Sequence, residues 1–171
     1  MLKAESGQER SLKIQRTRAK LRSTTLGMLA DFFIAYPAEA MRYANRNDDP
    51  DEGEEIELLL NPAQFKGITG LEIGTLWAIL ECREWDVKRH MPEDICVGED
   101  DESWLYRFPD DLTSILANSD KEGLTRASEQ WAKTEELDCD SADLLPLLEN
   151  LQSLARQAGV KGQSVYLWGC L

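Results

Sequence analysis

The sequence Ser164-Val-Tyr-Leu-Trp-Gly-Cys-Leu171 is the stretch that decides the fold. Val165 to Trp168 is apolar at every position, so both faces of a strand formed from it would be apolar. A run of this kind is typical of a strand buried on both sides, because a half-exposed strand alternates apolar and polar residues. The sequence therefore predicts that the final strand lies inside a sheet, and the earlier strands must be arranged to receive it.

A long amphipathic helix is predicted immediately before this strand. Ser141 can cap its start, because a hydroxyl oxygen accepts a hydrogen bond from a free backbone N–H. Gly159 is the predicted stop, and Lys161-Gly162 would complete a tight connection to the strand. The residues that recur at helical spacing and form one apolar face are Leu144, Leu147, Leu148, Leu151, Leu154, Ala155 and Ala158.

The first part of the domain is predicted to be a strand followed by a helix. Residues 28–36 are rich in aromatic residues and end at Pro37, which is typical of a strand. Residues 37–44 then form a helix, because proline is favoured in the first helical turn. Residues 47–55 are acidic and are expected to form a solvated loop, since they do not fit the glycine and glutamate positions of a calcium-binding loop.

A central helix and a hairpin are predicted in the middle of the chain. Thr69-Gly-Leu-Glu72 has the spacing of a capping box, and the helix that follows is apolar nearly all round. Residues 94–97 and 104–108 flank an acidic stretch and predict a β-hairpin. Further helices are predicted to begin at Pro109 and Ser119, ahead of the last helix.

Together these elements predict an α+β fold in a single globular domain, residues 28–171. We expect a small mixed or antiparallel sheet covered by about five helices, with the C-terminal strand buried in the sheet. The chain of 171 residues is long enough to bury such a core.

Residues 1–27 differ from the rest of the chain in charge. They contain seven Lys or Arg and two Glu, a local charge of +5, which leaves −18 for the remainder. We interpret this segment as a basic N-terminal tail that is mobile or loosely helical. An upstream extension ahead of a domain that starts at Met28 is the alternative. A nucleic-acid or membrane arm is disfavoured, because the segment has no aromatic residues.

The composition indicates an acidic cytoplasmic protein. The net charge of −13 argues against nucleic acid and anionic membranes as partners. It favours a basic protein partner or simple solubility. We find neither a signal peptide nor an apolar run long enough to cross a bilayer. The four cysteines show no CxxC pairing and are expected to be reduced thiols: Cys82, Cys96, Cys139 and Cys170.

The candidate binding surface is a charged segment that contains one tryptophan. It comprises Glu81, Glu84, Trp85, Asp86 and His90. A tryptophan among charged residues can be an exposed interaction anchor, whereas in the structural alternative it covers the end of the central helix. No metal site is predicted, because His90 is the single histidine of the chain.

Motifs for catalysis and cofactor binding are otherwise missing. A cysteine–histidine pair would have to use His90 with Cys82 or Cys170. Residues 67–70 are too short for a phosphate-binding loop and lack the lysine. We therefore predict no catalytic residue and no cofactor.

Both ends of the domain resemble a known family. The opening Gly27-Met-Leu-Ala-Asp-Phe-Phe33, with Pro-Ala-Glu-Ala after it, is similar to small uncharacterised bacterial proteins of the YfbM-like kind. The end is also similar, residues 151–159 followed by residues 165–168. The middle of the chain around Trp77 departs from this pattern. The resemblance implies an α+β domain in which the first and last strands pair, and it carries no activity that could be transferred to residues of this chain.

Two classes of function follow from these observations. The first is a non-enzymatic interaction module of the inhibitor or immunity type, whose acidic surface binds a more basic protein. The alternative is a small-molecule-binding protein or an enzyme with a cleft near Trp85 and His90. The missing catalytic motifs favour the first class, and the oligomeric state stays open.

Overall fold

The computed structural model describes residues 28–98, 102–137 and 139–171. Within these ranges the chain forms one five-stranded sheet and six helices, so the predicted α+β fold is confirmed. The predicted tail, residues 1–27, lies outside the described residues, and its mobile or loosely helical state stays a prediction.

All neighbouring strands are antiparallel, in the order β2-β1-β5-β4-β3. The strands are β1 (Leu29–Ala35), β2 (Ala63–Lys66), β3 (Glu93–Val97), β4 (Ser103–Arg107) and β5 (Ser164–Cys170). The helices are α2 (Pro37–Ala44), α3 (Pro50–Leu60), α4 (Gly70–Glu81), α5 (Asp110–Asn118), α6 (Lys121–Trp131) and α7 (Ser141–Lys161).

The C-terminal strand β5 is the central strand of the sheet, as its apolar run predicts. It pairs with β1 on one side, where Tyr166 lies opposite Phe33. It pairs with β4 on the other, where Leu167 lies opposite Tyr106. Residues 165–168 are all buried, because helices cover both faces of the sheet at this strand.

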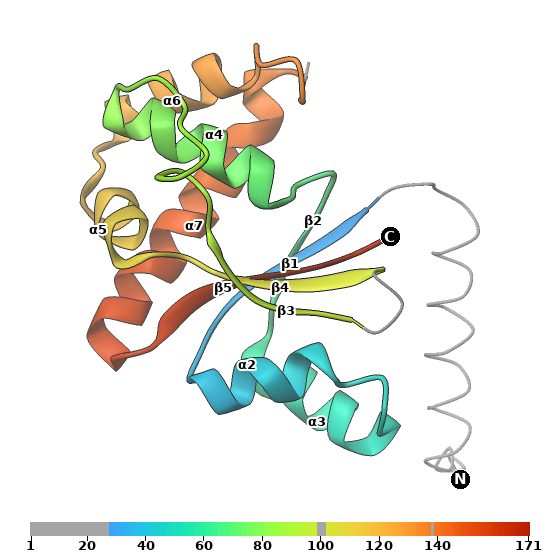
Figure 1. The fold of residues 1–171 in the computed structure, drawn as a ribbon. Coiled ribbons are helices and arrows are strands. Elements are labelled where there is room, and N and C mark those ends of the chain that lie inside the picture. Colours follow the sequence, from blue (N-terminus) through green and yellow to red (C-terminus); the bar gives the residue numbers. More distant parts are fainter. Residues whose placement is uncertain (1–27, 99–101, 138) are drawn as a thin grey trace, which may run out of the picture.

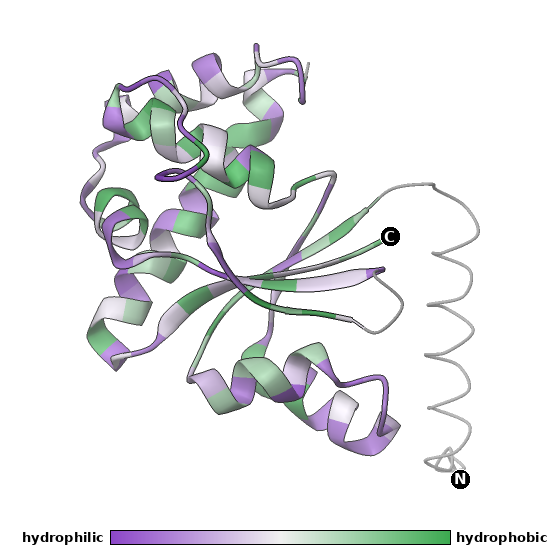
Figure 2. Ribbon diagram, in the orientation of Figure 1, coloured by the Kyte–Doolittle hydropathy of each residue, from purple (hydrophilic) through white to green (hydrophobic). Residues whose placement is uncertain are grey.

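Two layers of helices lie on opposite faces of the sheet. Helices α4, α5, α6 and α7 lie on one face, and the smaller pair α2 and α3 lies on the other (Figure 1). Val165 and Leu167 belong to the larger core, which includes apolar side chains of α7. Tyr166 and Trp168 belong to the smaller core under α2 and α3. The hydropathy colouring shows hydrophobic segments on α4 and α7 and much hydrophilic colour along α3 (Figure 2).

The predicted acidic loop at residues 47–55 is wrong, because most of it belongs to helix α3. Asp49 is the N-cap, and its carboxylate accepts hydrogen bonds from the backbone N–H groups of Asp51 and Glu52 at 3.0 and 3.3 Å. Pro50 occupies the first helical turn, where its missing N–H costs nothing. Carboxylates in that turn are also favoured by the helix dipole.

The predicted stop of the last helix at Gly159 is also wrong. Helix α7 continues to Lys161, and Gly162 ends it with a left-handed φ of 65°. Gly159 is therefore an interior position of the helix. Both glycines could supply a C-terminal cap, and only the backbone geometry distinguishes them.

Candidate functional site

Glu81, the first residue of the predicted surface, ends α4 and has a largely covered side chain. Its side chain is 8% exposed and forms a two-pronged ion pair with Arg89. The indole N–H of Trp77 donates to Oε1 of the same carboxylate at 3.1 Å. The hydrogen bonds from Arg89, with a smaller contribution from His90, lower the pKa of Glu81 from 4.5 to about 2.

His90 is buried, with 1% of its surface exposed, and both ring nitrogens have partners. Nδ1 accepts a hydrogen bond from the backbone N–H of Asp86 at 2.9 Å. An accepting nitrogen carries no proton, so the proton of the neutral ring lies on Nε2, which is 3.2 Å from Glu81 Oε2. His90 thus joins the end of α4 to the segment that follows it, and neither nitrogen bonds to a cysteine sulfur.

The other predicted residues lie on the surface. Glu84 is exposed, and Trp85 is 43% exposed. The carboxylate of Asp86 accepts from the backbone N–H of Lys88 at 2.9 Å, which stabilises the local turn. The structure therefore brings Glu81 and His90 into contact and leaves Glu84 and Trp85 exposed.

The close packing of residues 85–90 against α4 depends on Gly74. We expect Gly74→Ala to destabilise the protein by about 1–3 kcal/mol in urea unfolding. An added methyl group would overlap the backbone carbonyl oxygen of His90, so the segment would have to move. Gly159→Ala is the matched control, because its added methyl group meets nothing within 4 Å and should leave stability unchanged or slightly higher. Equal stabilities of the two variants would contradict the packing of this segment.

A second surface, which the sequence did not predict, lies on the solvent side of α3. Leu58 and Leu59 are 75% and 62% exposed there. Four exposed carboxylates precede them on the same helix. We define the α3 surface as Asp51, Glu52, Glu54, Glu55, Leu58 and Leu59. The sequence feature that could have predicted helix α3 is the Asp49-Pro50 pair, because this pair is typical of an N-cap and the first helical turn.

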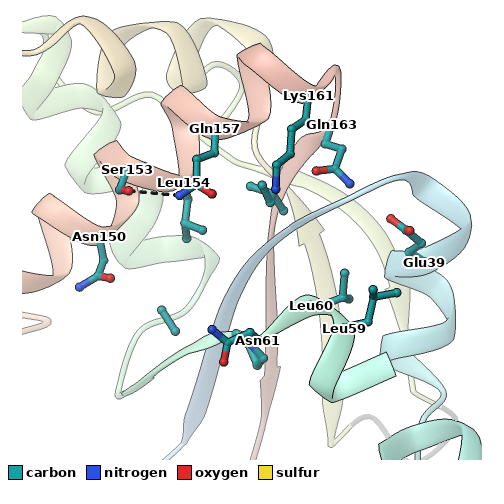
Figure 3. Close-up of a pocket in the computed structure, with 13 residues that line it drawn as sticks. Glu39, Leu59, Leu60, Asn61, Asn150, Ser153, Leu154, Gln157, Lys161 and Gln163 are labelled. Carbon is teal, nitrogen blue, oxygen red and sulfur yellow. Dashed lines mark hydrogen bonds between the residues drawn. The ribbon is translucent and has the colours of Figure 1, made fainter. Parts of the chain in front are cut away.

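A cleft of about 580 Å³ adjoins the α3 surface. Figure 3 shows Leu59, Leu60 and Asn61 of the α3 end on one side, with polar side chains of α7 on the other. Asn150 and Gln157 are among the α7 residues, so the cleft offers both hydrogen-bond donors and acceptors. Leu59 contributes to both the α3 surface and the cleft, so the two form one continuous feature.

The fold and this feature define an acidic α+β domain with a charged, partly apolar helix beside a polar cleft. No protein-family model, curated protein or solved structure matches the chain. Of the helices in the described part of the chain, none is both long enough and apolar enough to cross a membrane.

Proposed function

We propose that the protein is a non-enzymatic interaction module of the inhibitor or immunity type, which binds a basic protein through the α3 surface and the adjoining cleft. The observation that carries the proposal is the pair Leu58 and Leu59, both exposed beside four carboxylates. Burial of apolar side chains in an interface favours binding, and surrounding charges select and steer the partner.

The two leucines are large enough to matter for affinity. Full burial of a leucine side chain contributes about 1.5–3 kcal/mol, and each 1.4 kcal/mol changes the dissociation constant about tenfold. The carboxylates of the α3 surface attract a basic partner, and added salt screens that attraction. The net charge of −13 acts in the same direction over the whole molecule.

The surface around Trp85 receives less support as the binding site. Glu81 and His90 use their polar atoms in contacts within the protein. The Trp85 indole also lies against Gly74 of α4, which fits the alternative in which it covers the helix. An enzyme at this position would need a different base from His90, because both of its nitrogens are bonded.

The test is affinity capture from a lysate of the source cells at low and high salt, followed by mass spectrometry. We expect one stoichiometric basic protein that is retained at low salt and lost at high salt. The double variant Leu58→Ser, Leu59→Ser should weaken binding of that purified partner about tenfold to a hundredfold. Neutralising Glu54 and Glu55 to Gln should slow association and reduce the salt dependence.

Val87→Ser is the matched control, because Val87 is 55% exposed in the segment after α4 and lines neither the α3 surface nor the cleft. This variant should bind the partner as the unchanged protein does. An empty capture, or a partner held equally well after both leucines are replaced, would overturn the proposal. The cytoplasmic location and the resemblance to YfbM-like proteins stay predictions.

A further inference from the structure

A second cavity lies on the α2–α3 side of the sheet and belongs to neither the α3 surface nor the cleft. Its volume is about 320 Å³, at the lower end of the range of small-molecule sites. We name it the Arg46 cavity, after the side chain that enters it from the turn following α2. Its walls include Leu29, Asp31, Arg46, Glu57, Lys66 and Trp168.

The Arg46 side chain is buried, with 7% of its surface exposed, and contacts on several sides hold it in place. Its guanidinium carbon lies 3.9 Å from the centre of the Tyr43 ring and 3.7 Å from a ring of Trp168. The two rings are nearly perpendicular, at 88°, and the guanidinium lies in the corner between them, a contact that is favourable for a cation. One terminal nitrogen donates to the backbone carbonyl of Tyr43 at 2.8 Å, and the other lies 3.3 Å from Asp31 Oδ2.

The Nε–H of Arg46 is different, because it has no hydrogen-bond partner among the described residues. The Glu57 carboxylate approaches it at 3.8 Å, which is too long for a hydrogen bond. Buried donors are nearly always satisfied in proteins. Arg46 and Glu57 both line the cavity, so an acceptor bound there could take the Nε–H and a donor beside it could reach Glu57.

Asp31 has the role of positioning Arg46. Its Oδ2 accepts from the Tyr43 hydroxyl at 2.7 Å as well as pairing with Arg46. Burial raises the pKa of Asp31, while the hydrogen bond from Tyr43 and the charge of Arg46 oppose that rise. Asp31 thus holds the guanidinium against the two rings, while the Nε–H has no hydrogen-bond partner among the described residues.

The charges around the cavity are balanced, unlike those of the protein as a whole. Asp31 and Glu57 carry negative charge, and Arg46 and Lys66 carry positive charge. A lone anion would meet the Glu57 carboxylate, and a lone cation would meet the guanidinium. A small molecule with both charges is the class that can satisfy both ends of the cavity.

We propose that the Arg46 cavity binds a small zwitterion of the amino-acid class, with its carboxylate at Arg46 Nε and Lys66 and its ammonium group at Glu57. The inference is independent of the proposed protein interaction. The Leu58→Ser, Leu59→Ser variant should therefore keep this binding, which distinguishes failure of one proposal from failure of the other.

The experiment titrates the isotope-labelled full chain with each proteinogenic L-amino acid at millimolar concentrations, followed by amide NMR spectra. We expect saturable shifts from at least one of them, centred on backbone amides of residues that line the cavity. Acetate and methylammonium, which each carry a single charge, should give no saturable shift at the same concentrations.

Lys66→Met and Glu57→Gln are the informative variants, because neither side chain is buried and both should leave the fold intact. Each should raise the dissociation constant about tenfold or more, whereas Lys88→Met, at an exposed position on another segment, should not. The proposal is overturned if no amino acid produces saturable shifts, if the shifts lie elsewhere, or if acetate alone reproduces them. It is equally overturned if Lys66→Met and Glu57→Gln bind as the unchanged protein does.

Discussion

A chain that ends at Ser164 is expected not to fold, because residues 165–171 supply most of the central strand. Strand β5 forms the hydrogen-bonded ladders to both β1 and β4, so its loss separates the two halves of the sheet. Val165 and Leu167 leave the larger core, and Tyr166 and Trp168 leave the smaller one. Four such side chains contribute roughly 6–12 kcal/mol, which is comparable with the whole stability of a typical domain, about 5–15 kcal/mol.

Near-ultraviolet circular dichroism and thermal unfolding would measure this effect. The truncated chain should give no fixed aromatic signal and no cooperative transition. Leu171→Ser is the matched control, because that side chain is 71% exposed and only the backbone N–H at this position bonds to Glu102. The control should stay within about 0.5 kcal/mol of the unchanged protein. A truncated chain that melts cooperatively at a similar temperature would refute the central role of β5.

Replacement of Glu81 by Gln is expected to give the second large effect, a loss of about 2–3 kcal/mol of unfolding free energy at neutral pH. The amide cannot form the charged pair with Arg89 and cannot accept equally from Trp77 and His90. Glu84→Gln is the control, because this carboxylate is exposed on the same segment. We expect it to change stability by no more than about 0.5 kcal/mol in urea unfolding.

The same substitution should change the response to acid. The pKa of Glu81 is about 2 in the folded protein and near 4.5 when unfolded, so the unfolded state binds the extra proton first. The stabilisation by this carboxylate is therefore complete above pH 4.5 and is lost as the pH falls towards 2. The stability difference between the unchanged protein and Glu81→Gln should shrink over this window. A difference that stays constant with pH would show that the charge of Glu81 does not stabilise the fold.

Much of the fold was predictable because the signals were local. The capping box at Thr69 is present, with the Thr69 hydroxyl accepting from Leu71 N–H at 3.0 Å and Glu72 accepting from Thr69 N–H at 2.6 Å. Pro37 begins α2, and residues 93–97 and 103–107 form the predicted hairpin. Each of these signals involves residues a few positions apart, so a short stretch of sequence contains the whole interaction.

The candidate sites were less predictable, since they depend on contacts between distant residues. The chain turns back after α4, so Arg89 and His90 bond to Glu81 at the end of that helix. The residues of the predicted surface at 81–90 therefore do not form one exposed site. That return also buries Glu81, although nothing in its immediate sequence distinguishes it from Glu84. The α3 surface was missed for a different reason, because an acidic run with proline and glycine fits both a loop and a capped helix.

The sequence alone therefore determined most of the helices and strands, although not α3 and β2. It also determined the central place of β5, since an apolar run of that kind requires cover on both faces. The tertiary structure decided which charged groups are buried and paired. Arg46 shows the physical reason: its position is set by Tyr43 nearby and by Trp168 at the far end of the chain. Those two rings meet only because β5 lies beside β1 in the folded sheet, and no local pattern encodes that meeting.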